Sequence, residues 1–137
     1  MTEARKILVI DDDPDIREVL TMVLEAGGYK VTTAKYGVEG LEKIREDKPD
    51  LVILDLIMPG MGGFAVYKKL KDPAHPEWND IRILILTSVR EESSRAQFER
   101  ETGEQLAVDD YIEKPITPAL ILERVGKIIK NGYRTSV

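Results

Sequence analysis

The stretch Leu51-Val52-Ile53-Leu54-Asp55 is an apolar run that ends in a single carboxylate. Two similar runs occur in the chain: Ile7–Ile10 leads into three consecutive aspartates, and Ile83–Leu86 leads into Thr87 and Ser88. Near-continuous apolar runs of this kind are typical of parallel strands that are covered on both faces. Ligands of an open parallel sheet bind beyond the carboxyl ends of its strands. We therefore expect these acids and the threonine hydroxyl to form one polar site.

The composition favours one soluble globular domain. The chain has 137 residues, 42% of them hydrophobic and 33% charged, which is enough for one core and too short for two comfortable domains. The chain has 25 Asp and Glu residues and 20 Lys and Arg residues, so its net charge is −5. This negative charge argues against direct nucleic-acid binding. The absence of cysteine excludes disulfides and thiolate metal sites. No apolar stretch approaches the ~18 residues that span a bilayer, and the first residues lack a signal-peptide core, so we expect a cytoplasmic protein without membrane insertion.

Strand and helix patterns alternate along the whole chain. The predicted strands are Lys6–Ile10, Lys30–Ala34, Leu51–Leu54, Arg82–Leu86 and Tyr111–Ile112. Amphipathic spacing predicts five helices, of which the fourth is a strongly charged segment from about residue 91 to 106. Val19 and Val38 are among the residues that define the apolar faces of the first two helices, and Asp13-Pro14 has the pattern of a helix start. This alternation predicts an α/β fold with a doubly wound, five-stranded parallel sheet.

Four short motifs resemble those of the receiver domain of two-component response regulators. They are Ile7–Pro14, Leu54–Met61, Leu86–Ser88 and Asp109–Pro115. Each is weak alone, but four in this order at the ends of the expected strands are specific. The resemblance covers about residues 5–131 and leaves residues 1–4 and 132–137 as short termini. It implies the flavodoxin-like strand order 2-1-3-4-5 and a stand-alone receiver of the chemotaxis type.

The resemblance also implies that Asp55 accepts a phosphoryl group from a sensor histidine kinase or a phosphotransfer protein. A carboxylate can act as a nucleophile and form a covalent acyl phosphate. Asp55 suits this role because it is the single acid at the tip of a central apolar strand. The chain would then be a signalling switch that catalyses only its own phosphotransfer and autodephosphorylation, and not an enzyme in the usual sense.

Three carboxylates that converge on one point repel one another. Two unit charges at ~4 Å cost about 4 kcal/mol at an effective dielectric of about 20. A hard divalent cation relieves this repulsion and prefers carboxylate, carbonyl, water and phosphate oxygens. The resemblance assigns Mg²⁺, or Mn²⁺, to Asp12, Asp55 and the backbone carbonyl of Ile57, with Asp11 acting mainly through an ordered water.

The remaining motifs imply a phosphate clamp and a switch. Lys114 would pair with Asp55 at rest and with the phosphoryl group afterwards, turned inward by a cis bond before Pro115. The Thr87 hydroxyl would donate to a phosphoryl oxygen, and Tyr111 would fill the space that Thr87 leaves. The fourth helix, fifth strand and fifth helix would then present a changed surface to a downstream protein whose identity stays open.

Two parts of the sequence depart from the family pattern. Gly62 stands where such domains commonly have an aspartate, so the helix that follows lacks a capping carboxylate. The segment from residue 90 to residue 108 is longer than in compact receivers, and its role stays open.

Two alternative functions fit the sequence less well. An aspartate-nucleophile phosphatase of the haloacid-dehalogenase type would need an Asp-x-Asp-x-Thr pattern after the first strand and a cap domain, whereas residues 11–15 read Asp-Asp-Asp-Pro-Asp. A flavodoxin-like binding module would need a phosphate-cradling loop at the same place, where three aspartates would instead repel phosphate.

Overall fold

The computed structural model describes residues 4–56, 62–87, 96, 99, 100 and 107–131. These residues form the predicted α/β fold with one parallel sheet, and its strand order is β2-β1-β3-β4-β5, as the family resemblance implies. The strands are β1 (Lys6–Ile10), β2 (Lys30–Ala34), β3 (Leu51–Asp55), β4 (Arg82–Thr87) and β5 (Asp110–Glu113). The helices are α1 (Pro14–Ala26), α2 (Gly37–Glu46), α3 (Gly63–Leu70) and α5 (Pro118–Asn131), with a short 3₁₀ helix at Pro76–Trp78. Four α-helices therefore lie in the described part of the chain, and most of the predicted fourth helix falls outside it.

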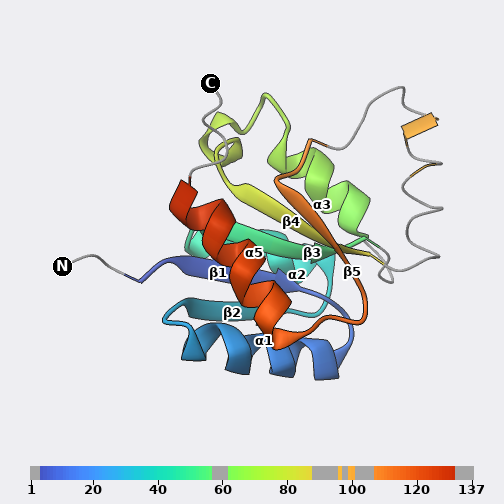
Figure 1. The fold of residues 1–137 in the computed structure, drawn as a ribbon. Helices are drawn as coiled ribbons and strands as arrows, with labels where there is room; N and C mark the ends of the chain where they lie inside the picture. Colours follow the sequence, from blue (N-terminus) through green and yellow to red (C-terminus); the bar gives the residue numbers. More distant parts are fainter. Residues whose placement is uncertain (1–3, 57–61, 88–95, 97–98, 101–106, 132–137) are drawn as a thin grey trace.

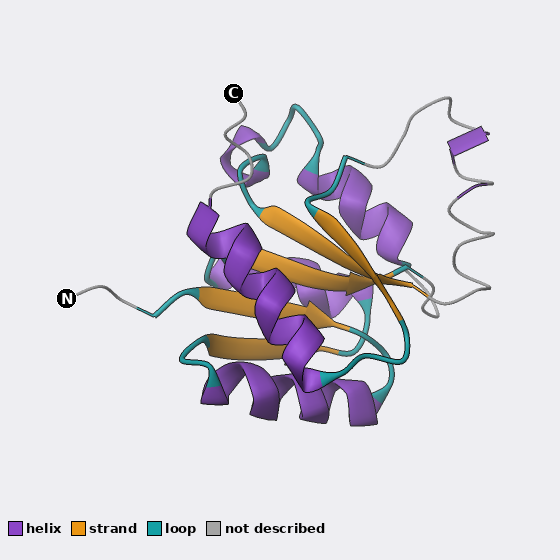
Figure 2. Cartoon of the chain, in the orientation of Figure 1, coloured by secondary structure: helices purple, strands orange, loops and turns teal. Residues whose placement is uncertain are grey.

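The helices cover the two faces of the sheet, so the strands form a middle layer (Figures 1 and 2). On one face, Leu20 and Leu24 of α1 and Val125 and Ile128 of α5 belong to one buried cluster. On the other face, α2 and α3 contribute to a second buried cluster, as Ile44 and Leu70 do. Every residue of β3 is buried, which explains why this strand reads as a continuous apolar run.

Helix α1 begins where the sequence predicts. The side chain of Asp13 accepts a hydrogen bond from the backbone N–H of Asp15 at 2.9 Å, and Pro14 occupies the first helical position. This arrangement satisfies one of the N–H groups that a helix start leaves without an intrahelical partner. The helix ends at Gly27, and Gly28 adopts a φ of 96°, a conformation that favours glycine.

Two predicted core positions are wrong. Val19 is 43% exposed and Val38 is 55% exposed, although both follow the helical spacing of their neighbours. Helical spacing indicates which side of a helix is apolar, but it does not show how far the sheet extends beneath that side.

Helix α3 begins without a side-chain cap, because its N-cap residue is Gly62. The lack of a capping carboxylate at this position is confirmed. The first helical residue, Gly63, packs closely on the end of β3: a Cβ atom there would overlap the carbonyl oxygen of Asp55 and lie 2.6 Å from the Cα of Leu56. A glycine is therefore needed at residue 63 for α3 to pass this close to the strand.

Candidate functional site

The register of the sheet brings the predicted site residues to one edge. Ile10 pairs with Leu54 across β1 and β3, so Asp11 and Asp55 follow side by side at the carboxyl ends of neighbouring strands. Asp55 in turn pairs with Leu86 across β3 and β4, and Thr87 is the next residue of β4. The prediction that these polar residues meet beyond the apolar runs is confirmed for this part of the site.

Three carboxylates gather at this edge. One oxygen from each of Asp11, Asp12 and Asp55 lies within 4.8 Å of the others. Asp11 and Asp55 are buried, with exposed fractions of 0% and 2%, whereas Asp12 is exposed. Buried carboxylates this close together need a cation or a proton, because neither water nor distance screens their repulsion.

Asp11 is held by hydrogen bonds on three sides. Its backbone N–H donates to the carbonyl of Ala34 at 3.2 Å, and its carboxylate Oδ1 accepts from the N–H of Asp13 at 2.9 Å. Its own carbonyl accepts from Arg17 Nη1 at 2.8 Å. The second carboxylate oxygen, Oδ2, is buried and accepts no hydrogen bond from any described residue. Among the described residues, that oxygen pairs with Lys114 Nζ at 3.5 Å, and it can also face a bound cation or a water.

Lys114 supplies a positive charge at the site. Its Nζ lies 3.5 Å from Asp11 Oδ2 and 3.7 Å from Asp55 Oδ1. Its backbone N–H donates to the carbonyl of Thr87 at 2.7 Å, which ties the loop after β5 to the end of β4. The Lys114-Pro115 bond is cis, as the resemblance implies. One ammonium faces two buried carboxylates, so the site keeps an excess of negative charge when both are ionised.

Burial raises the pKa of the Asp11 carboxyl above its usual value of 3.8. The N–H of Asp13 and the ammonium of Lys114 act in the opposite direction, while the negative charge of Asp12 adds to the rise. The direction of this pKa shift means that the folded protein resists ionising Asp11 more than the unfolded chain does.

The donor set fits a hard divalent cation. The two buried carboxylates of Asp11 and Asp55 and the exposed carboxylate of Asp12 offer the oxygen ligands that Mg²⁺ prefers. The predicted carbonyl ligand belongs to Ile57, which lies outside the described residues. The described residues therefore supply an incomplete but chemically suitable set of ligands.

Thr87 and Tyr111 share one face of the sheet. Ile85 pairs with Tyr111 and Thr87 pairs with Glu113 across β4 and β5. Because side chains alternate along a strand, Thr87 projects from the same face as Ile85 and Tyr111. Thr87 is buried at 1% exposed, and Tyr111 is half-buried against the cluster on the α2 and α3 face. The two side chains therefore project from one face of the sheet, and their coupling stays a prediction.

Two contacts, one at the site and one at the amino end of β5, were not predicted from the sequence. Arg17 reaches Asp11 from within α1, and Arg124 of α5 makes a two-bond ion pair with Asp110, its Nη1 lying 3.0 Å and 2.8 Å from the two carboxylate oxygens. Arg17 lies three residues before the buried Leu20, and Arg124 lies three residues after the buried Ile121, so each arginine borders the buried face of its helix. Only the three-dimensional packing of α1 and α5 shows what they contact.

The fold and the acidic site match a known protein family. The family model of the response regulator receiver domain matches residues 7–126, and the chain belongs to that family. Members of this family are signalling proteins of two-component systems, in which a histidine kinase supplies phosphate to an aspartate of the receiver. No helix in the described ranges is both long enough and apolar enough to cross a membrane.

Curated relatives of this chain include transcriptional regulators. The chain is 38% identical over 128 residues to the alkaline phosphatase synthesis transcriptional regulatory protein PhoP of Bacillus subtilis, covering 93% of this chain and 50% of that protein. It is 37% identical over 136 residues to the transcriptional regulatory protein ResD of the same organism, covering 98% of this chain and 52% of that protein. The chain thus spans about half the length of the curated relatives it matches, and the prediction that it acts as a stand-alone receiver stays a prediction.

Solved structures agree with this family. The signal receiver domain of a signal transduction histidine kinase from Syntrophus aciditrophicus matches with a TM-score of 0.80 and 30% identity, over 98% of this chain and 97% of that one. The chemotaxis protein CheY4 of Vibrio cholerae matches with a TM-score of 0.77 and 26% identity, over 91% of this chain and 98% of that one.

Proposed function

We propose that Asp55 is the phosphoacceptor of this receiver and that its donor is the phosphohistidine of a sensor histidine kinase or a phosphotransfer protein. One observation carries the proposal. Asp55 ends the central strand β3, is 2% exposed, and has a lysine ammonium at 3.7 Å and two further carboxylates close by. A buried acid costs stability in the folded protein, which supports a functional role for Asp55.

The transfer is a balanced displacement. A carboxylate oxygen of Asp55 forms the new bond to phosphorus, while the bond from phosphorus to the donor imidazole nitrogen breaks. The imidazole nitrogen keeps the electron pair of that bond. Because phosphoryl transfer needs mainly positioning and charge neutralisation, the receiver has little other covalent chemistry to perform.

The side chains around Asp55 would position the phosphoryl group and neutralise its charge. Lys114 lies close enough to Asp55 to contact a phosphoryl oxygen after a small movement, and the Thr87 hydroxyl would donate to another. Bound Mg²⁺, or Mn²⁺, would neutralise charge that builds up on the transferred oxygens. Asp12, Asp55 and the carbonyl of Ile57 would hold the ion, with Asp11 acting through a water.

The output would be a switch between two arrangements of the surface near β5. A phosphoryl group adds charge and acceptor oxygens, which would draw Thr87 toward Asp55. The vacated space lies on the face from which Tyr111 projects, so the tyrosine ring could turn inward. The surface of β5, α5 and the predicted fourth helix would then bind a downstream protein in the cytoplasm. The net charge of −5 supports a protein partner over direct contact with nucleic acid by this chain.

The test is incubation with acetyl phosphate and Mg²⁺ followed by intact mass. Wild-type protein is expected to gain one phosphate-sized adduct, and the Asp55→Asn variant is expected to gain none. Asp47→Asn is a matched acid-to-amide control, because Asp47 is exposed and pairs with Lys6, the first residue of β1, at the opposite end of the sheet. An undiminished adduct on Asp55→Asn, or none on the wild type, would contradict the proposal.

A further inference from the structure

We propose that Arg17 is a positioning residue for the acidic site and that it acts through the backbone carbonyl of Asp11. This inference rests on the proposed function, because it concerns how the chain holds a divalent cation. Among the described residues, no hydrogen bond or ion pair joins Arg17 to a carboxylate of the site. Its Nη1 instead donates to the Asp11 carbonyl at 2.8 Å.

That one hydrogen bond fixes two metal-site residues. The carbonyl of Asp11 and the N–H of Asp12 belong to the same planar peptide group. Holding the carbonyl therefore fixes the direction in which the chain enters Asp12. The N–H of Asp11 is fixed in turn by Ala34, on the far side of β1 from Asp55. The backbone of the turn after β1 is thus held on both sides of Asp11. In the Asp11 carboxylate, Oδ2 accepts no hydrogen bond from the described residues.

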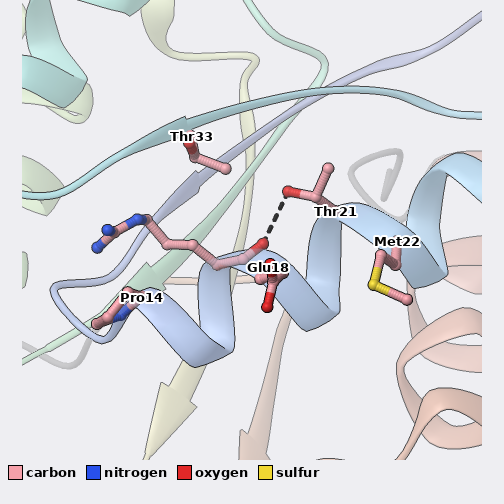
Figure 3. A pocket seen from close by; sticks show the side chains of 6 residues that line it. Pro14, Glu18, Thr21, Met22 and Thr33 are labelled. Carbon is pink, nitrogen blue, oxygen red and sulfur yellow. Dashed lines mark hydrogen bonds between the residues drawn. The ribbon is translucent and has the colours of Figure 1, made fainter.

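Arg17 is itself held in place by α1. Its backbone N–H donates to the carbonyl of Asp13 at 3.1 Å, and its carbonyl accepts from Thr21 Oγ1 at 2.7 Å. Its side chain helps to line a hollow of about 350 Å³ between α1 and β2, with Pro14, Glu18, Thr21, Met22 and Thr33 (Figure 3). The arginine therefore connects this surface hollow to the backbone of Asp11.

Charge and positioning predict opposite effects when Arg17 is removed. Arg17 carries a positive charge close to the place where a cation would bind. If it acted only as a charge, its removal would strengthen Mg²⁺ binding, because like charges repel. If it positions the turn, its removal weakens Mg²⁺ binding, as the loss of outer-shell partners does at metal sites in general. The sign of the change separates the two roles.

The experiment is an Mg²⁺ titration followed by the amide signals of the site in two-dimensional NMR spectra, at constant ionic strength. The Arg17→Met variant is expected to raise the Mg²⁺ dissociation constant by about fivefold or more. Arg17→Lys keeps the charge and one donor, and its dissociation constant is expected to lie between those of the wild type and Arg17→Met. Glu18→Gln is the matched control, because Glu18 lines the same hollow, and it is expected to change the dissociation constant by less than about twofold.

Thermal unfolding of each variant, recorded beforehand, sets a temperature at which all four proteins are folded. An unchanged or lower dissociation constant for Arg17→Met would overturn the inference. A dissociation constant for Arg17→Lys no lower than that of Arg17→Met, or an equal weakening by Glu18→Gln, would also overturn it. Failure of the wild type to bind Mg²⁺ would instead overturn the metal part of the proposed function, and this inference with it.

Discussion

Replacing Asp11 with asparagine is expected to stabilise the protein when no divalent cation is present. At the 4.8 Å that bounds the separation of the Asp11 and Asp55 oxygens, two like charges repel by about 3.5 kcal/mol at an effective dielectric of about 20. On the same scale, the Lys114 ammonium at 3.5 Å attracts Asp11 by about 4.7 kcal/mol. Asp12 is exposed and adds only about 1 kcal/mol of repulsion in a dielectric near that of water.

These charge terms nearly cancel, so the burial of the Asp11 carboxylate decides the sign. Burying an ion costs several kcal/mol, and the hydrogen bond from the Asp13 N–H offsets about 2 kcal/mol of that cost. Asparagine can keep this hydrogen bond without the charge. The free energy of unfolding of Asp11→Asn is therefore expected to exceed that of the wild type by about 1 to 2 kcal/mol at pH 7.

The stability gained by Asp11→Asn should increase as the pH rises. Because the pKa of Asp11 is raised in the folded state, the wild type loses stability as the pH rises from 3.8 through the folded pKa. The advantage of Asp11→Asn is thus full above the folded pKa, shrinks as the pH falls through that range, and is absent below 3.8. Saturating Mg²⁺ should stabilise the wild type more than the variant, since a ligand that binds only the folded state adds to its stability.

Urea unfolding followed by circular dichroism, in buffer containing EDTA, measures this difference. The Asp47→Asn variant gives a control of opposite sign, because Lys6 lowers the pKa of Asp47 and the loss of that pair should not stabilise the protein. An Asp11→Asn protein less stable than the wild type in EDTA at pH 7 would contradict the net cost assigned to the buried Asp11 charge.

Two further predictions concern packing around the site. Gly63→Ala should destabilise the protein by about 2 kcal/mol or more in the same urea assay, because the new methyl group would meet the backbone at Asp55; a change under about 0.5 kcal/mol would contradict this. Ile53→Ala should cost about 2 to 5 kcal/mol because Ile53 is fully buried in β3, whereas Val38→Ala, at an exposed position, should cost little; equal losses in both variants would contradict the assigned burial.

The sheet could be predicted from the sequence because its strands carry their own signal. Buried parallel strands such as β3 and β4 must be apolar on both faces, so a short run of Ile, Leu and Val defines them. The carboxylates of Asp11 and Asp55 stand out for the same reason, since each follows or ends such a run. Their meeting at one edge then follows from the parallel register.

Other features depend on packing that the sequence does not show. The exposure of Val19 and Val38 depends on where the sheet ends beneath each helix. The hydrogen bond from Arg17 depends on how a long side chain turns back from α1 to the turn after β1. Helical spacing places both valines on an apolar face and predicts no contact for Arg17, so only the assembled fold shows where these side chains lie.

The most direct test of the central proposal is to locate the phosphoryl group after reaction with acetyl phosphate and Mg²⁺. Three carboxylates lie within 4.8 Å of one another, so an intact-mass gain alone would not identify the acceptor. Rapid proteolysis and peptide mass mapping separate the peptide that carries Asp55 from the one that carries Asp11 and Asp12. We predict that the adduct is found on the Asp55 peptide alone. An adduct on the Asp11–Asp12 peptide, or on a hydroxyl side chain elsewhere, would contradict the assignment of Asp55 as the phosphoacceptor.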